Sequence, residues 1–285
     1  MTHPDAAKVA VVTGASAGIG RSTARMLGQL GWHVIGVGRD PGRAAEAEAE
    51  IKASAASGAR VDFLRGDFNV MADVKRVAGE IAALTGHIDV LINNAGGVRD
   101  ERYVTPDGLE ATFAANHLAP FLLTRELMPL LKAAGSARVL AVSSSGHEYC
   151  SGMNWDDLQF ERDFTTGGAY CQAKLANLLF TRELDRRIAA DGMVAQAMHP
   201  GRVASNFASH GDQMMQSHMA ATSNITPDQP AATLVWMATA PETGAPGARY
   251  FHEMQEVPTA PQALDAAAAA RLWKESEAIL SRLGV

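Results

Sequence analysis

The sequence predicts a single α/β domain with a doubly wound parallel sheet and helices on both of its faces. Short apolar runs alternate with longer stretches of helical pattern as far as residue 198. This alternation is typical of parallel strands joined by right-handed helical crossovers. The length of 285 residues fits one large domain, and neither a linker-like composition nor an internal repeat divides the chain. We therefore expect one domain over residues 1–285.

The predicted strands are apolar runs whose lengths match buried strands of a parallel sheet. They cover residues 8–12, 32–38, 61–64, 88–92, 138–143 and 194–198. Predicted helices start at Ile19 and cover residues 43–57, 70–85, 109–134 and 169–190, and an alanine-rich stretch at 266–273 predicts another. Two long connections, 148–168 and 205–230, interrupt the alternation. Because long connections after strands often carry ligand-binding residues, we expect the segment 205–230 to cover the substrate site.

A glycine-rich turn, Thr13–Gly20 (TGASAGIG), joins the first predicted strand to the first predicted helix. Gly14 is expected at a sharp turn with positive φ, Gly18 leaves backbone N–H groups open to an anion, and Gly20 lets the helix approach the sheet. The helix N-terminus then presents N–H donors and a positive dipole end. The bare spacing G-x-x-x-G-x-G also fits an ordinary tight turn. Its place between a strand and a helix favours a pyrophosphate site for a dinucleotide.

The composition narrows the classes of function. A formal net charge of -6 argues against nucleic acid or an anionic membrane as a partner. The two cysteines, Cys150 and Cys171, fit a reducing compartment, and the polar N-terminus and lack of a long apolar run predict a cytoplasmic protein without a membrane anchor. The nine histidines form no H-x-x-x-H pair and the cysteines no C-x-x-C pair, so no metal site is predicted.

Tyr170 and Lys174 lie four residues apart in a predicted helix and therefore share one of its faces. A nearby ammonium lowers the pKa of a tyrosine, which lets the pair exchange a proton with an alcohol oxygen. An isolated Y-x-x-x-K is more often an ordinary helix face. Ser144, after the fifth predicted strand, favours the chemical interpretation because its hydroxyl can bind a carbonyl. Asn116 can hold a water in a proton path or satisfy a backbone group.

Together these residues resemble the short-chain dehydrogenase/reductase family, whose members have a Rossmann-type fold. The matching motifs are TGASAGIG, NNAG at 93–96, Asn116, VSS at 142–144, YCQAK at 170–174 and HPG at 199–201. Their order and spacing fit over most of the chain. The stretches NHLAPFLLT, AYCQAKLANLLFTREL and RLWKESEAIL resemble more narrowly the retinol-dehydrogenase-like branch.

The resemblance implies a role for each catalytic residue. Tyr170 is the general acid/base, Lys174 lowers its pKa and holds the nicotinamide ribose, and Ser144 rather than Ser145 positions the carbonyl. Asn116 completes the proton relay. The residues implied in cofactor binding are Gly14, Ser16, Gly18, Ile19, Gly20, Arg39, Asp67, Phe68, Asn94, Ala95, Gly96, Tyr170, Lys174, Pro200, Gly201 and Val203.

Arg39 favours NADP as the cofactor. The second strand is expected to end beside the adenosine ribose, and its tip, Gly38, supplies no carboxylate for the hydroxyls of NAD. The Arg39 guanidinium suits a 2′-phosphate. Asp40 is a complication, because it could bind the ribose hydroxyls or neutralise Arg39.

We therefore expect a hydride transfer between NADP(H) and a carbonyl or secondary alcohol, with a lipophilic or aromatic ketone or aldehyde as substrate. The alternatives are an NAD-dependent secondary-alcohol dehydrogenase and a non-catalytic dinucleotide-binding regulator. A serine hydrolase using Ser144 and His147 is disfavoured because no G-x-S-x-G surrounds the serine. Met214, Met215 and Met219 suggest an apolar substrate wall. Apolar residues on several faces of helices 109–134 and 169–190 predict a homodimer or homotetramer.

Overall fold

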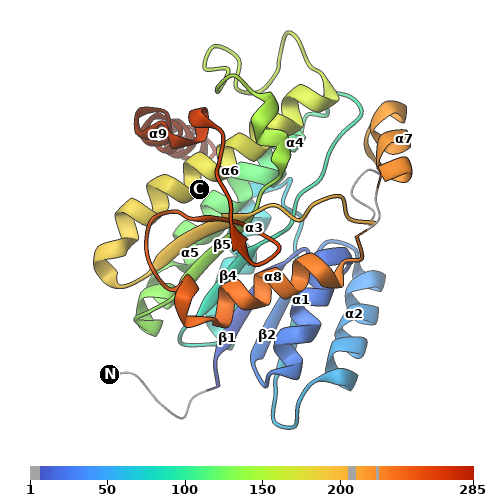
Figure 1. The fold of residues 1–285 in the computed structure, drawn as a ribbon, viewed down its shortest axis with the longest axis vertical. Helices are drawn as coiled ribbons and strands as arrows, with labels where there is room; N and C mark the ends of the chain where they lie inside the picture. Colours follow the sequence, from blue (N-terminus) through green and yellow to red (C-terminus); the bar gives the residue numbers. More distant parts are fainter. Residues whose placement is uncertain (1–6, 205–209, 223–224) are drawn as a thin grey trace.

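The computed structural model describes residues 7–204, 210–222 and 225–285, and its centre is one sheet flanked by helices (Figure 1). The strand order is β3-β2-β1-β4-β5-β6-β7-β8. The strands are β1 Val9–Thr13, β2 His33–Gly38, β3 Val61–Arg65, β4 Val90–Asn93, β5 Arg138–Val142, β6 Val194–Met198, β7 Tyr250–His252 and β8 Gln255–Glu256. The strands pair in parallel except β8, which runs antiparallel to β7. The doubly wound α/β fold is thus confirmed. The two last strands were not predicted, because they are too short to show a pattern.

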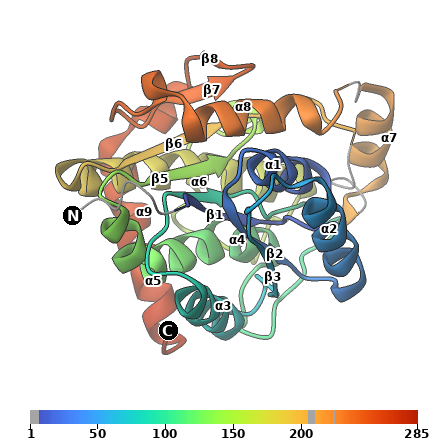
Figure 2. The ribbon, with the colours of Figure 1, turned by 90° about the horizontal axis from the view of Figure 1, so that it is seen from below.

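Helices cover both faces of the sheet. The α-helices are α1 Gly18–Gln29, α2 Pro41–Ser54, α3 Met71–Leu84, α4 Ala111–Phe113, α5 Ala119–Ala134, α6 Thr166–Ile188, α7 Gln213–Thr222, α8 Asp228–Thr239 and α9 Ala266–Arg282. Shorter helical segments are η1 Ala114–Leu118, η2 Ser145–Tyr149, η3 Ala189–Asp191, η5 Pro241–Thr243 and η6 Pro261–Leu264. Helices α1, α2 and α8 lie on one face, and α3, α5, α6 and α9 lie on the other (Figure 2).

Alternate residues of the strands build the two cores. In β1, Val9 and Val11 point into the core shared with α3, α5 and α6, whereas Ala10 and Val12 point into the core shared with α1, α2 and α8. Both sets are buried because side chains alternate across a strand and helices cover both faces. This is why the strands are continuous apolar runs in the sequence.

The chain changes direction within the sheet at β1. From β1 it builds β2 and β3 on one side, and it then crosses to β4 on the other side. In an open parallel sheet such a switch point leaves a crevice at the carboxyl ends of the strands, where ligands bind. The glycine-rich turn after β1 and the NNAG segment after β4 both lie at this point.

The predicted helix 109–134 is interrupted in the structure. A single turn, α4, passes into the π-helical segment η1 before α5 begins. The extra residue per turn in a π-helical segment changes the direction of its side chains, and such segments are frequent at functional sites. Asn116 lies in the middle of this segment.

Helix α9 packs against α6. The Trp273 ring lies 5.9 Å from that of Phe180 and 4.7 Å from that of Phe121. On α6, Leu178 and Leu179 are also buried within the single chain. Side chains of this kind in helices 109–134 and 169–190 were the basis for predicting a homo-oligomer, which stays a prediction.

Candidate active site

A cavity of about 570 Å³ opens at the carboxyl edge of the sheet. It is lined by every predicted catalytic and cofactor-binding residue except Gly20. These lining residues are Gly14, Ser16, Gly18, Ile19, Arg39, Asp67, Phe68, Asn94, Ala95, Gly96, Asn116, Ser144, Tyr170, Lys174, Pro200, Gly201 and Val203. They come from segments distributed over nearly 190 residues of sequence, namely the carboxyl ends of β1 to β6 and the helical segments η1 and α6.

The glycines of the first turn lie where the backbone conformation or a close contact favours glycine. Gly14 and Gly18 have φ values of 68° and 51°. A Cβ atom at Gly20 would lie 2.4 Å from the Gly14 carbonyl oxygen, so Gly20 allows α1 to start directly against the turn. Helix α1 has no side-chain cap and no acidic residue in its first turn. Its N–H groups and positive dipole end are therefore available to an anion in the cavity.

Thr13 connects the turn to the NNAG segment, a role that the sequence analysis missed. Its Oγ1 accepts hydrogen bonds from the backbone N–H of Asn94 at 3.0 Å and of Ala95 at 2.9 Å, and it donates to the Ile92 carbonyl. The Asn94 side-chain amide donates to the Thr13 carbonyl at 2.8 Å. These bonds fix the two cofactor-facing segments relative to each other. In the sequence, the signal for this role was a threonine directly after the first predicted strand.

Ser144 and Tyr170 are hydrogen-bonded to each other. Ser144 caps η2, where its Oγ accepts a hydrogen bond from the Gly146 N–H at 3.0 Å. The neighbouring Ser143 is buried and donates to the Lys174 carbonyl, and Ser145 is exposed. Of the three serines, Ser144 is the one whose hydroxyl meets the tyrosine.

Lys174 is buried, and its Nζ donates to the Val142 carbonyl at 3.0 Å. The Nζ lies 5.6 Å from the centre of the Tyr170 ring. Burial lowers the pKa of Lys174 to about 8. Burial also raises the pKa of Tyr170 well above its usual value, although the hydrogen bond with Ser144 opposes this. The net shift of the Tyr170 pKa is upward, because desolvation of the phenolate is its largest cause.

Asn116 is held by backbone groups. Its Nδ2 donates to the carbonyls of Gly97 at 2.9 Å and Thr112 at 2.8 Å, and its Oδ1 accepts from the Gly97 N–H at 3.2 Å. A Cβ atom at Gly96 would lie 2.4 Å from this Oδ1. Asn116 therefore holds Gly97, directly after the NNAG segment, and the absence of a side chain at Gly96 makes room for it.

Arg39 and Asp40 both follow β2, but only Arg39 lines the cavity. The Asp40 carboxylate caps α2, where it accepts from the Arg43 N–H at 2.8 Å and lies 3.7 Å from the Arg43 guanidinium. It neither neutralises Arg39 nor faces the cavity. A Cβ atom at Gly38 would lie 2.9 Å from the Ser16 Cβ, so the strand tip leaves no room for an acidic side chain.

The charge of the cavity wall is strongly positive. Its cationic residues are Arg39, Arg43, Arg99, Lys174 and Arg202, and its only carboxylate belongs to Asp67 among the residues that the structure describes. The whole chain carries a net charge of -6, so the cations are concentrated at the cavity. The sequence analysis missed Arg43, Arg99 and Arg202, which lie outside the motifs.

His147 does not act on Ser144 as a base. Its Nδ1 lies 2.7 Å from the Ser144 carbonyl oxygen, and its Nε2 accepts from the Ala260 N–H at 3.1 Å. Both ring nitrogens are bound to backbone groups, which excludes the serine hydrolase alternative on geometry. His147 connects the Ser144 segment to the C-terminal part of the chain.

The structure describes only part of the segment 205–230, which is predicted to cover the substrate site. Residues 205–209 and 223–224 of the predicted stretch lie outside the described residues. His210 and Met219 line the cavity, whereas Met214 is 78% exposed and is not part of the lining. The suggested wall of methionines is thus reduced to Met219 among the side chains described.

Comparison with known proteins agrees with this geometry. Residues 8–216 match the family model described as short chain dehydrogenase. The chain belongs to the short-chain dehydrogenase family. It is 33% identical to retinol dehydrogenase 14 of Homo sapiens over 97% of this chain and 87% of that protein. It is 36% identical to polyprenol dehydrogenase of Mus musculus over 95% of this chain and 83% of that protein. The solved structure of a metagenomic short-chain oxidoreductase in complex with NADP has a TM-score of 0.60 and 26% identity, covering 81% of this chain and 90% of its own.

Membership of this family, in its retinol-dehydrogenase-like branch, makes the protein an oxidoreductase of CH–OH and C=O groups that binds a nicotinamide dinucleotide. The cavity fits that cofactor, because it combines an uncapped helix N-terminus, a close glycine turn and a cationic wall. In the parts of the chain that are described, no helix is long and apolar enough to span a membrane. Those parts also contain no group of three metal-ligating side chains.

Proposed function

We propose that this protein transfers a hydride from NADPH to a lipophilic or aromatic ketone or aldehyde. The choice of NADPH over NADH rests on the residues at the tip of β2. Arg39 lines the cavity, Gly38 has no room for a carboxylate, and Asp40 is bound to the start of α2. A guanidinium without a competing carboxylate favours a 2′-phosphate over two hydroxyls.

Ser144 and Tyr170 supply the proton side of the proposed reaction. Their hydrogen bond places two hydroxyls at one point, where a substrate carbonyl oxygen can accept from both. Because burial raises the pKa of Tyr170, the phenol is protonated at neutral pH and can donate its proton to the developing alkoxide. The bound nicotinamide supplies the hydride.

Lys174 and Asn116 are assigned to supporting steps. The Lys174 ammonium, held by the Val142 carbonyl, is expected to bind the nicotinamide ribose and to return a proton toward Tyr170. Asn116 is proposed to hold Gly97 beside the cofactor through its two hydrogen bonds to the Gly97 backbone. Its Oδ1 retains a lone pair that can accept a water in the proposed proton relay.

Apolar side chains in the cavity wall support a lipophilic substrate. Val142, Tyr149 and Met219 line the cavity, and Tyr149 is 84% exposed. The relatives in the comparison are named for retinol and polyprenol, which are both lipophilic alcohols. We propose that the described part of the segment 205–230 covers this substrate.

Two alternatives are tested by the same measurements. An NAD-dependent secondary-alcohol dehydrogenase would keep the residues at Ser144 and Tyr170 but would bind NADH more tightly. A non-catalytic regulator would bind the dinucleotide without turnover.

A cytoplasmic location and a homodimer or homotetramer also stay predictions. The latter is measured as a solution mass above that of the 30.1 kDa chain.

Arg39→Ala is the decisive variant for the cofactor. It should weaken NADPH binding by about 1.5–3 kcal/mol, the usual contribution of a hydrogen bond to a charged group, and should hardly change NADH binding. Titration calorimetry with both cofactors measures this, and purified wild-type enzyme is assayed in parallel against aromatic, steroid and aliphatic carbonyls. Tighter binding of NADH by the wild type, or equal losses for both cofactors in the variant, would exclude the proposal.

A further inference from the structure

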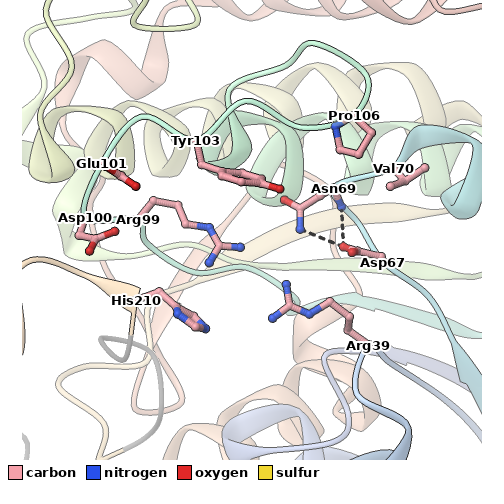
Figure 3. Close-up of a pocket in the computed structure, with 10 residues that line it drawn as sticks. All are labelled: Arg39, Asp67, Asn69, Val70, Arg99, Asp100, Glu101, Tyr103, Pro106 and His210. Carbon is pink, nitrogen blue, oxygen red and sulfur yellow. Dashed lines mark hydrogen bonds between the residues drawn. The ribbon is translucent and has the colours of Figure 1, made fainter.

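A second, smaller cavity of about 290 Å³ lies beside Arg39 (Figure 3). It shares five lining residues with the larger cavity, namely Arg39, Asp67, Asn69, Arg99 and His210. The two cavities are therefore neighbouring parts of one opening. The smaller part extends from the tip of β2 to the loop that follows β4.

Three nitrogen-bearing side chains from distant segments converge on this space. Arg39 follows β2, Arg99 lies in the loop after β4, and His210 precedes α7. Figure 3 shows both guanidinium groups and the imidazole ring directed into the same space. Neither arginine has an ion pair with any residue in the described ranges. The Arg99 guanidinium lies 5.9 Å from the centre of the half-exposed Tyr103 ring, which supports it from one side.

Among the described residues, the acidic side chains of this cavity form no ion pair with Arg39 or Arg99. Asp67 accepts two hydrogen bonds from Asn69, from its backbone N–H at 3.0 Å and its side-chain amide at 2.9 Å. Asp100 and Glu101 follow Arg99 in the loop, and their carboxylates lie on the far side of Arg99 from Arg39 (Figure 3). Arg39, Arg99 and His210 thus supply donors to a space whose lining also includes the Asp67 carboxylate.

We propose that Arg99 and His210 complete, together with Arg39, a three-sided site for the 2′-phosphate of NADPH. This inference rests on the proposed preference for NADPH. A phosphate offers three oxygens, and two guanidinium groups and an imidazole N–H can each donate to a different one. Arg39 alone would bind one side of the phosphate and leave the rest to water. Cofactor selectivity is then distributed over three segments of the chain rather than held in the tip of β2.

The test uses two small probes that differ in this phosphate, adenosine 2′,5′-bisphosphate and adenosine 5′-monophosphate. Calorimetry measures their affinities for the wild type and for the Arg99→Gln, His210→Ala and Arg39→Ala variants. Gln keeps most of the length of the Arg99 side chain but removes the charge. The matched control is Arg65→Ala, because Arg65 is an exposed cation at the end of β3 that pairs in register with Gly38 but lines neither cavity.

Arg99→Gln and His210→Ala should each lower the affinity for the bisphosphate by about 3–30-fold. The affinity for the monophosphate should stay within about 2-fold, since only the bisphosphate carries the contacted 2′-phosphate. Arg65→Ala should change neither affinity by more than about 2-fold. If Arg39→Ala lowers the affinity for the bisphosphate but Arg99→Gln and His210→Ala do not, this inference is wrong and the proposed function stands. If the wild type does not prefer the bisphosphate, the NADPH preference itself fails. Equal losses for both probes, or a loss in Arg65→Ala as large as that in Arg99→Gln, would also overturn the three-sided site.

Discussion

Tyr170 is the residue on which the proposed chemistry depends. Tyr170→Phe removes the hydroxyl that bonds Ser144 and keeps the ring, so the shape of the cavity should be preserved. We expect turnover to fall by about 10²–10⁴-fold, the usual contribution of a general acid, with little change in the affinity for NADPH. Single-turnover hydride transfer and cofactor titration measure the two quantities separately. Retention of most of the activity would show that another group donates the proton.

Lys174 illustrates how a buried charge lowers stability. Burial lowers the pKa of Lys174 from 10.5 to about 8, so the folded state holds its proton less tightly than the unfolded state. Below pH 8 the ammonium is charged in both states and its full desolvation opposes folding. As the pH rises from 8 toward 10.5 the folded state loses the proton first, and the opposing free energy disappears.

Lys174→Met should therefore stabilise the protein while removing turnover. The expected gain in the free energy of unfolding is about 1–3 kcal/mol near pH 7, because each pKa unit corresponds to about 1.4 kcal/mol and part of the gain is lost with the hydrogen bond to Val142. The gain should shrink at higher pH. Urea unfolding of both proteins at pH 7 and pH 10 measures it. A gain that is the same at both pH values would contradict the assignment of the cost to the buried ammonium.

At the scale of elements, α9 completes the core on one face of the sheet. Its Leu272 is buried, and the neighbouring Trp273 packs on Phe121 and Phe180. Leu272→Ala should lower the free energy of unfolding by about 2–5 kcal/mol through lost burial and the cavity left behind. No residue of α9 lines the active-site cavity, so the affinity for NADPH should stay the same.

Chemical denaturation and cofactor titration test both halves of this expectation. A lower midpoint at unchanged slope would assign the effect to stability of the folded state. A change in cofactor affinity without a change in the midpoint would instead mean that α9 acts on the site through α6.

The π-helical segment η1 is the element that sequence periodicity could not predict. Residues 109–134 show one continuous apolar pattern, and the single extra residue in a turn at Ala114–Leu118 leaves that pattern almost unchanged. The consequence is local but important, because Asn116 lies there and bonds Gly97. Only the packing of this turn against the NNAG segment decides its geometry.

At the scale of the whole molecule, charge is distributed unevenly. The chain is acidic overall, with a net charge of -6, whereas the cavity wall carries five cations and one carboxylate among the described residues. NADPH binding should weaken as sodium chloride rises from about 0.05 to 0.5 M, because salt screens the attraction between the wall and the cofactor phosphates. NADH carries fewer phosphate charges, so its affinity should fall less. Dissociation constants measured over this range, with the KM of a neutral carbonyl substrate as the control, test the expectation. Equal losses for both cofactors would contradict it.

The sequence by itself determined the alternation of strands and helices, the glycine turn and the order of the family motifs. These features depend on residues close together in the chain, such as Gly14, Gly18 and Gly20 in one turn or Tyr170 and Lys174 on one helix face. Local periodicity and spacing are sufficient to predict them. Ser144, Asn116 and Arg39 could be selected as candidates, because each stands at a recognisable place relative to a predicted element.

The tertiary structure alone decided the interactions between distant residues. Thr13 binds Asn94, α9 covers α6, and Arg99 and His210 approach Arg39 across separations of 60 residues or more. It also placed the Asp40 carboxylate at the start of α2 and surrounded Tyr170 so that burial raises its pKa. The physical reason is that burial, charge and hydrogen-bond partners are properties of a place in the folded molecule. A parallel sheet brings distant strand ends to one edge, and their neighbours there cannot be identified from the local sequence.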